Sequence, residues 1–140
     1  MSALALILVE RGFAVSGSDT SDSNNIKNLL NKNVRIFKKQ TAENIKEICE
    51  SNLKAPLVIV SSAIPKTNPE LIAAEKSKLQ IIHRSDLLAE LIKKQPSIAV
   101  AGTHGKTTTS TIITTLLAKS NEDPTAIIGV IVPLYNRNYN

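Results

Sequence analysis

The sequence is poor in aromatic residues and in cysteine. Its 140 residues include no Trp, two Phe, two Tyr and a single cysteine, Cys49. The hydrophobic core must therefore be aliphatic, and aliphatic runs are typical of parallel sheets that are buried on both faces. One cysteine excludes an intramolecular disulfide, and no Cys/His spacing around it suits a metal ion. We therefore expect a reducing, cytoplasmic location.

Signals for nucleic-acid binding and for membrane insertion are also missing. The 17 basic residues exceed the 12 acidic ones and give a formal charge of +5, but no Arg-rich tract or aromatic–basic alternation is present. Scattered lysines are typical of a solvated surface, so the sequence predicts no nucleic-acid partner. The apolar opening 1–12 lacks a signal peptide's basic flank and is too short to span a bilayer. We interpret it as a buried helix of a protein with no membrane association.

The sequence instead alternates regularly between strand-like and helix-like segments. Strands are predicted at 13–18, 34–37, 57–62, 80–83, 97–101 and 125–132. Helices are predicted over 1–12, 25–31, from 41 onward, over 70–78, over 85–94 and after residue 105, with Thr41 and Asn68 as N-caps. This alternation predicts an α/β fold with a mostly parallel sheet. The interruption at 95–97 predicts two domains, 1–95 and 96–140.

The stretch that suggests chemistry is 102-GTHGKTT-108, between an apolar strand-like segment and a helix-like one. A Walker loop has a further glycine five residues before Gly105, where this sequence has Val100. The remaining requirements are met, because Gly102 and Gly105 allow backbone N–H groups to approach phosphate oxygens closely. Lys106 supplies a cation for the phosphates. The alternative interpretation is an ordinary turn between two buried elements.

The segment after this loop has conflicting preferences. Residues 107–115 are rich in β-branched side chains, which favour strands. Apolar residues nevertheless recur with helical spacing at 112, 113, 116 and 117. We predict a helix, which would also place its N-terminal dipole at the loop.

The sequence 100-VAGTHGKTTTS-110 resembles the ATP loop of the Mur ligase family, and segments 1–19, 58–71, 83–91 and 127–136 are similar to that family in the same order. The resemblance implies a Rossmann-like UDP-sugar-binding domain at 1–95 and the start of a P-loop ATPase domain at 96–140. The family's first strand, its glycine-rich diphosphate loop, and most of its central and C-terminal domains have no counterpart in this sequence. We therefore expect an N-terminal fragment that does not catalyse ligation alone.

The resemblance also implies an activity in peptidoglycan precursor synthesis. Enzymes of this branch use ATP and Mg²⁺ to convert the carboxylate of UDP-N-acetylmuramate into an acyl phosphate, which the amine of L-alanine then attacks. Three alternatives remain open. The first is a muropeptide-recycling ligase that attaches a tripeptide to the same sugar, the second is a nucleotide-binding module without catalysis, and the third is a non-functional remnant.

Site residues follow partly from the resemblance and partly from position. The resemblance implies a phosphate cradle in which Lys106 is catalytic, His104 shapes the loop, and Thr107 ligates Mg²⁺ with Thr108 as second choice. The expected cradle residues are Gly102, Thr103, His104, Gly105, Lys106, Thr107 and Thr108. For the UDP-sugar, the candidates lie at the carboxyl ends of predicted strands and are Asp19, Ser61, Ser62 and Ala63. The alternatives are a solvated loop Asp and serines that only cap a turn. His83 and Arg84 lie at another predicted strand end, but we expect a structural histidine and a surface arginine.

Overall fold

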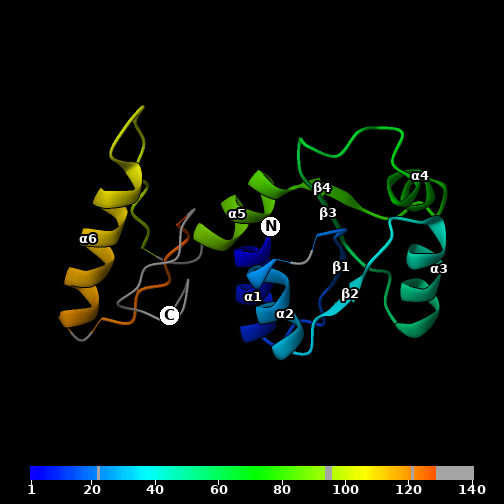
Figure 1. The fold of residues 1–140 in the computed structure, drawn as a ribbon, viewed down its shortest axis with the longest axis horizontal. Coiled ribbons are helices and arrows are strands. Elements are labelled where there is room, and N and C mark those ends of the chain that lie inside the picture. The colour runs from blue at the N-terminus through cyan, green and yellow to red at the C-terminus, as the bar shows by residue number, and fades with distance from the viewer. Residues whose placement is uncertain (22, 94–95, 121, 129–140) are drawn as a thin grey trace. The chain divides into compact units, whose positions relative to one another are not determined.

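The computed structural model describes residues 1–21, 23–93, 96–120 and 122–128, and it divides into two compact units, Met1–Gln95 (unit 1) and Pro96–Asn140 (unit 2) (Figure 1). Unit 1 contains α1 (Ser2–Glu10), β1 (Ser16–Ser18), α2 (Asn24–Asn31), β2 (Arg35–Phe37), α3 (Ala42–Ser51), β3 (Val58–Val60), α4 (Pro69–Lys76), β4 (Ile81–His83) and α5 (Arg84–Ile92). In unit 2, the described residues form the helix α6 (Lys106–Lys119). None of the described helices is long and apolar enough to cross a membrane.

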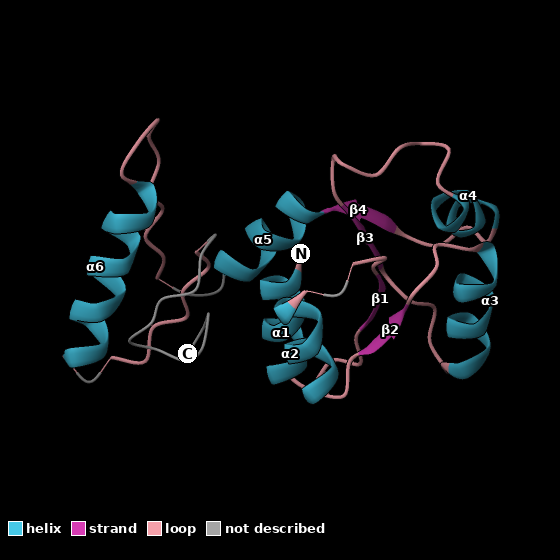
Figure 2. Cartoon of the chain, viewed as in Figure 1, coloured by secondary structure: helices cyan, strands magenta, loops and turns pink. Residues whose placement is uncertain are grey.

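The strands of unit 1 form two parallel pairs. β1 pairs with β2, with Gly17 opposite Ile36, and β3 pairs with β4, with Ile59 opposite Ile82 (Figure 2). α1, α2 and α5 lie on one side of the strands, whereas α3 and α4 lie on the other (Figure 1). Helices on both faces of parallel strands are the arrangement of an open α/β fold. The predicted fold class is therefore confirmed, although the strands form two separate pairs.

The core of unit 1 is aliphatic, as the lack of aromatic residues requires. Its buried side chains come from both helix layers and from the residue before β2, and they are Leu4, Leu6, Ile7, Ile26, Leu29, Val34, Ile45, Ala74 and Leu87. Three of them belong to α1, which confirms the prediction that this apolar segment is a buried helix. Burial of each Leu, Ile or Val side chain in this set contributes roughly 1.5–3 kcal/mol of hydrophobic free energy.

Local capping explains where two of the helices begin. The Ser23 side chain accepts a hydrogen bond from the Ile26 N–H at the start of α2. The Asn68 side chain accepts from the N–H groups of Glu70 and Leu71, and Pro69 occupies the first turn of α4. The predicted cap at Asn68 is confirmed, because its side-chain oxygen satisfies donors that have no partner within the helix.

Other predictions were wrong in extent or in kind. β3 ends at Val60, so Ser61 and Ser62 follow the strand. Thr41 is the N-cap residue of α3, as predicted, but its hydroxyl accepts no hydrogen bond from a helix N–H and instead donates to the Asn44 side-chain oxygen. Residues 97–101 and 125–128 are not strands, since a strand needs a neighbouring strand to bond its backbone and the described part of unit 2 supplies none. The remainder of the predicted strand, 129–132, lies outside the described residues.

Candidate functional site

The glycine-rich loop of unit 2 leads directly into a helix. Gly105 is the N-cap residue of α6 and has a φ of 76°, a left-handed conformation that favours glycine. Gly102 also has a positive φ, 153°, and a β-carbon there would lie 3.4 Å from the His104 carbonyl oxygen. Both glycines therefore occupy positions that glycine suits best. The predicted helix is confirmed over Lys106–Lys119 despite its β-branched residues.

Lys106 is the first residue of α6, and its ammonium group folds back over the loop. Its Nζ donates to the carbonyl oxygens of Gly102 and Thr103, the latter at 3.1 Å. The cation thus lies beside the helix N-terminus, where the first backbone N–H groups have no partner within the helix and where the dipole favours an anion. This combination of an ammonium group, free N–H donors and a positive dipole suits a phosphate group.

The remaining loop residues are open to solvent. Thr103, His104, Thr107 and Thr108 are all exposed, and Thr107 and Thr108 lie in the first turn of α6. An exposed hydroxyl in this turn can ligate a divalent cation together with phosphate oxygens, because hard cations prefer oxygen ligands. The residues present therefore fit a magnesium–nucleotide complex.

Asp19, in unit 1, directly follows β1. Its backbone N–H donates to the Phe37 carbonyl oxygen at 3.0 Å, which continues the pairing with β2. Its Oδ1 accepts from the Ser21 backbone N–H at 2.8 Å and from the Ser21 hydroxyl at 2.7 Å. These bonds, that from the hydroxyl first, lower the pKa of the Asp19 carboxyl group and keep it ionised. Asp19 thus stabilises its own turn while it remains at the carboxyl end of the strand.

Residues 61–63 form a turn directly after β3. The Ser61 carbonyl oxygen accepts from the Ile64 N–H at 3.0 Å, and Ser62 and Ala63 are exposed. At the end of β4, His83 is an N-cap residue: its Nδ1 accepts from the Ser85 N–H and its own N–H donates to the Asp86 carboxylate. His83 therefore has the structural role that the sequence predicted, as the N-cap of α5.

Sequence reasoning missed a group of polar residues near these turns. Glu70 in α4 accepts hydrogen bonds from Ser18, 52 positions earlier, and from Asn44, 26 positions earlier. The order Asn68-Pro69-Glu70 signals a helix start, but no local pattern indicates partners so distant in the sequence. Only the fold brings them together.

Comparison with known proteins supports both the fold and the family. The family described as "Mur ligase family, catalytic domain" matches residues 1–96, which end before the glycine loop. A UDP-N-acetylmuramate–L-alanine ligase of Prochlorococcus marinus strain MIT 9303 is 60% identical over 138 residues, which are 99% of this chain and 28% of that protein. A ligase of the same name from Synechococcus strain CC9311 is 58% identical over 99% of this chain and 29% of its own length. This chain therefore spans less than a third of the length of these relatives.

Solved structures agree with these relatives. The UDP-N-acetylmuramate–alanine ligase of Thermotoga maritima superposes with a TM-score of 0.85 at 29% identity, covering 99% of this chain and 31% of that one. A murein peptide ligase of Psychrobacter arcticus gives a TM-score of 0.83 at 29% identity over 98% of this chain and 28% of its own. Since the family match extends over 96 of the 140 residues, the chain belongs to the Mur ligase family.

Proposed function

We propose that this chain supplies the UDP-sugar site and the ATP phosphate site for ligation of L-alanine to UDP-N-acetylmuramate, a step of cytoplasmic peptidoglycan precursor synthesis. In this proposal unit 1 is the sugar-nucleotide domain and unit 2 is the beginning of the ATPase domain. The observation that carries the proposal is the loop–helix junction at Gly105–Lys106, in a chain 60% identical to a ligase of that name.

The chemistry explains why a phosphate site is needed. A carboxylate does not react with an amine until one of its oxygens has become a good leaving group. Transfer of the γ-phosphoryl group of ATP to the sugar carboxylate provides that group and releases ADP. Attack by the amine then forms the amide and releases phosphate. Mg²⁺, when bound, would neutralise charge on the phosphate oxygens.

In that scheme, residues of this chain would bind and orient the ATP phosphates and the UDP-sugar. Lys106 would exchange its bonds to the Gly102 and Thr103 carbonyl oxygens for bonds to phosphate oxygens, which its charge strengthens. The N–H groups at the start of α6 would bind the same phosphates, and Thr107 would hold Mg²⁺, with Thr108 as the alternative. His104 would shape the loop. In unit 1, Asp19 and the 61–63 turn would face the UDP-sugar.

The ATP site is tested by substitution of Lys106. We expect Lys106→Ala to weaken ATP binding to the 140-residue chain about ten- to a hundredfold, because it removes a charged hydrogen-bond donor. Lys119→Ala is the matched control, since Lys119 lies at the opposite end of the same helix. Isothermal titration with Mg-ATP measures both variants. Equal ATP affinity of the Lys106 variant and the wild-type chain would contradict the proposed phosphate site.

The ligation itself is tested in a chimera in which residues 1–140 replace the matching segment of the Prochlorococcus enzyme. We expect ADP formation that requires both UDP-N-acetylmuramate and L-alanine. A second chimera with the Psychrobacter murein peptide ligase, to which the chain is also similar, tests the recycling function. Activity restored only in the second chimera, with a tripeptide as substrate, would replace the alanine assignment.

A further inference from the structure

A polar network joins the loops at the carboxyl ends of the strands in unit 1. We define the carboxyl-edge hub as Ser18, Gln40, Asn44, Asn68 and Glu70. Glu70 lies in the first turn of α4, and its two carboxylate oxygens accept from different elements. Oε2 accepts from the Ser18 hydroxyl at 2.5 Å, at the end of β1, and Oε1 accepts from the Asn44 side-chain amide at 2.6 Å, in the first turn of α3.

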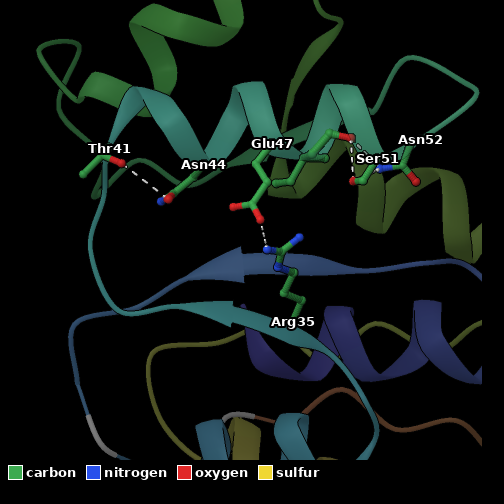
Figure 3. Close-up of polar contacts among 7 residues, drawn as sticks. Arg35, Thr41, Asn44, Glu47, Ser51 and Asn52 are labelled. Atoms are coloured by element: carbon green, nitrogen blue, oxygen red, sulfur yellow. Dashed lines mark hydrogen bonds and ion pairs between the residues drawn. The ribbon is translucent and has the colours of Figure 1, made fainter.

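Two further bonds extend the hub to the loop after β2. The Asn44 Nδ2 also donates to the Lys39 carbonyl oxygen at 2.6 Å, and the Asn68 Nδ2 donates to the Gln40 Oε1 at 2.7 Å. Figure 3 shows Asn44 beside Thr41, where this loop enters α3. The hub thus connects the segments that follow β1, β2 and β3, and it links the first strand pair to the second.

Burial makes the geometry of the hub specific. Asn44 is 8% exposed and Asn68 is 6% exposed, and they are the buried polar side chains among the described residues. Leaving a buried amide group without its hydrogen-bond partner costs about 1–3 kcal/mol of stability. The Asn44 and Asn68 side chains therefore each have one strongly favoured arrangement. Hydrogen bonds to a carboxylate are stronger than those between neutral groups. The Glu70 carboxylate therefore fixes the donors on both sides of it.

The location of the hub links it to ligand binding. Open parallel sheets bind their ligands at the carboxyl ends of the strands, in the loops that follow. Ser18 directly precedes Asp19, and the 61–63 turn belongs to the connection that leads to Asn68. A change at Glu70 would release the end of β1, which leads directly to Asp19, and the loop after β2. The hub does not need to touch the ligand to affect its affinity.

We propose that Glu70 is a positioning residue of the UDP-sugar site. Through Ser18 and Asn44, it holds the loops after β1 and β2 in the arrangement that accepts UDP-N-acetylmuramate. This inference rests on the proposed function of unit 1. Glu70 should therefore affect the affinity for UDP-N-acetylmuramate but not the affinity of unit 2 for ATP.

The test is isothermal titration of the 140-residue chain with UDP-N-acetylmuramate and, separately, with Mg-ATP. We expect Glu70→Ala to weaken sugar-nucleotide binding about tenfold or more, because two hydrogen bonds to a charged group are lost, and to leave ATP binding unchanged. Glu70→Gln should restore wild-type affinity, since its amide can accept from Asn44 and donate to the Ser18 oxygen. Glu75→Ala is the matched control, an exposed glutamate on the same helix.

A second variant keeps the test decisive if Glu70→Ala melts below the assay temperature. Ser18→Ala removes one hydrogen bond and leaves the rest of the hub in place, so it should weaken sugar-nucleotide binding in the same direction but less. Wild-type-like binding by Glu70→Ala or, failing that variant, by Ser18→Ala would overturn the positioning role, as would failure of Glu70→Gln to restore affinity. If the wild-type chain binds ATP but no UDP-N-acetylmuramate, the proposed sugar site fails and this inference fails with it.

Discussion

Among single residues, the Asp19–Ser21 turn offers a direct electrostatic test. The Ser21 hydroxyl and N–H lower the pKa of the Asp19 carboxyl group, so the folded state favours the ionised form. The resulting stabilisation is fully present above the unfolded pKa of about 4 and is lost as the pH falls through the lower folded value. We expect Ser21→Ala to raise the pKa of Asp19 towards its ordinary value. A carboxyl-carbon NMR titration measures it, and an unchanged pKa would contradict the hydrogen bond.

Gly105 offers a conformational test at the same scale. Its φ of 76° is unfavourable for any residue with a β-carbon, although a β-carbon there would meet no atom within 4 Å. Gly105→Ala should therefore destabilise the start of α6 by about 1–2 kcal/mol through backbone strain alone. We expect the α6 amides of this variant to exchange hydrogen faster and the variant to bind ATP more weakly than the wild-type chain. Gly17→Ala is the control, because Gly17 also has open space around it but no positive φ.

How far single residues were predictable depends on how local their interactions are. The glycine conformations before α6, the Asn68 cap and the N-cap role of His83 depend on neighbours within a few positions, and the sequence indicated each of them. The partners of Glu70 lie 26 and 52 positions away, so no local pattern reveals them. The roles of Asp19 and of residues 61–63 in binding stay predictions.

Among the elements, α4 depends on one capping residue. Asn68 satisfies two backbone donors of α4 with its oxygen and bonds Gln40 with its nitrogen, while it is almost fully buried. Asn68→Ala should cost about 1–2 kcal/mol of unfolding free energy, measured by urea denaturation. Asn68→Ser keeps a capping oxygen, loses the bond to Gln40 and introduces no charge, so its loss should be smaller. Equal losses in both variants would show that the cap contributes little.

The elements were predictable in type but less so in extent. Helices with a strong apolar face and a cap were found close to their observed bounds, and even the threonine-rich α6 formed, with hydroxyls of Thr114 and Thr115 bonding carbonyl oxygens one turn earlier. Strands were predicted too long, because a strand continues only where a neighbour pairs with it, and pairing is not a local property. The Arg35–Glu47 contact between β2 and α3 is another such non-local feature (Figure 3).

At the scale of the whole molecule, the two units should differ in stability. The buried aliphatic side chains of the described residues belong to unit 1, whereas Ile112 and Leu116 of α6 are 55% and 60% exposed. Amides that exchange slowly are those whose release needs the core to open. We expect the slowest hydrogen exchange near Ile7 and Leu29, with α6 exchanging much faster. Uniformly slow exchange across both units would contradict this, and a single cooperative unfolding transition would as well.

The division of unit 1 into two strand pairs has a genetic consequence. Within each pair the strands are joined by backbone amides, which every residue except proline provides, so few point mutations can remove such a ladder. Between the pairs, the described links at the carboxyl edge are side chains, and each is specified by one codon. Single substitutions in these side chains can therefore loosen the contact between the two strand pairs, while each pair keeps its backbone hydrogen bonds. Inherited variation should therefore accumulate in these side chains before it reaches the strands.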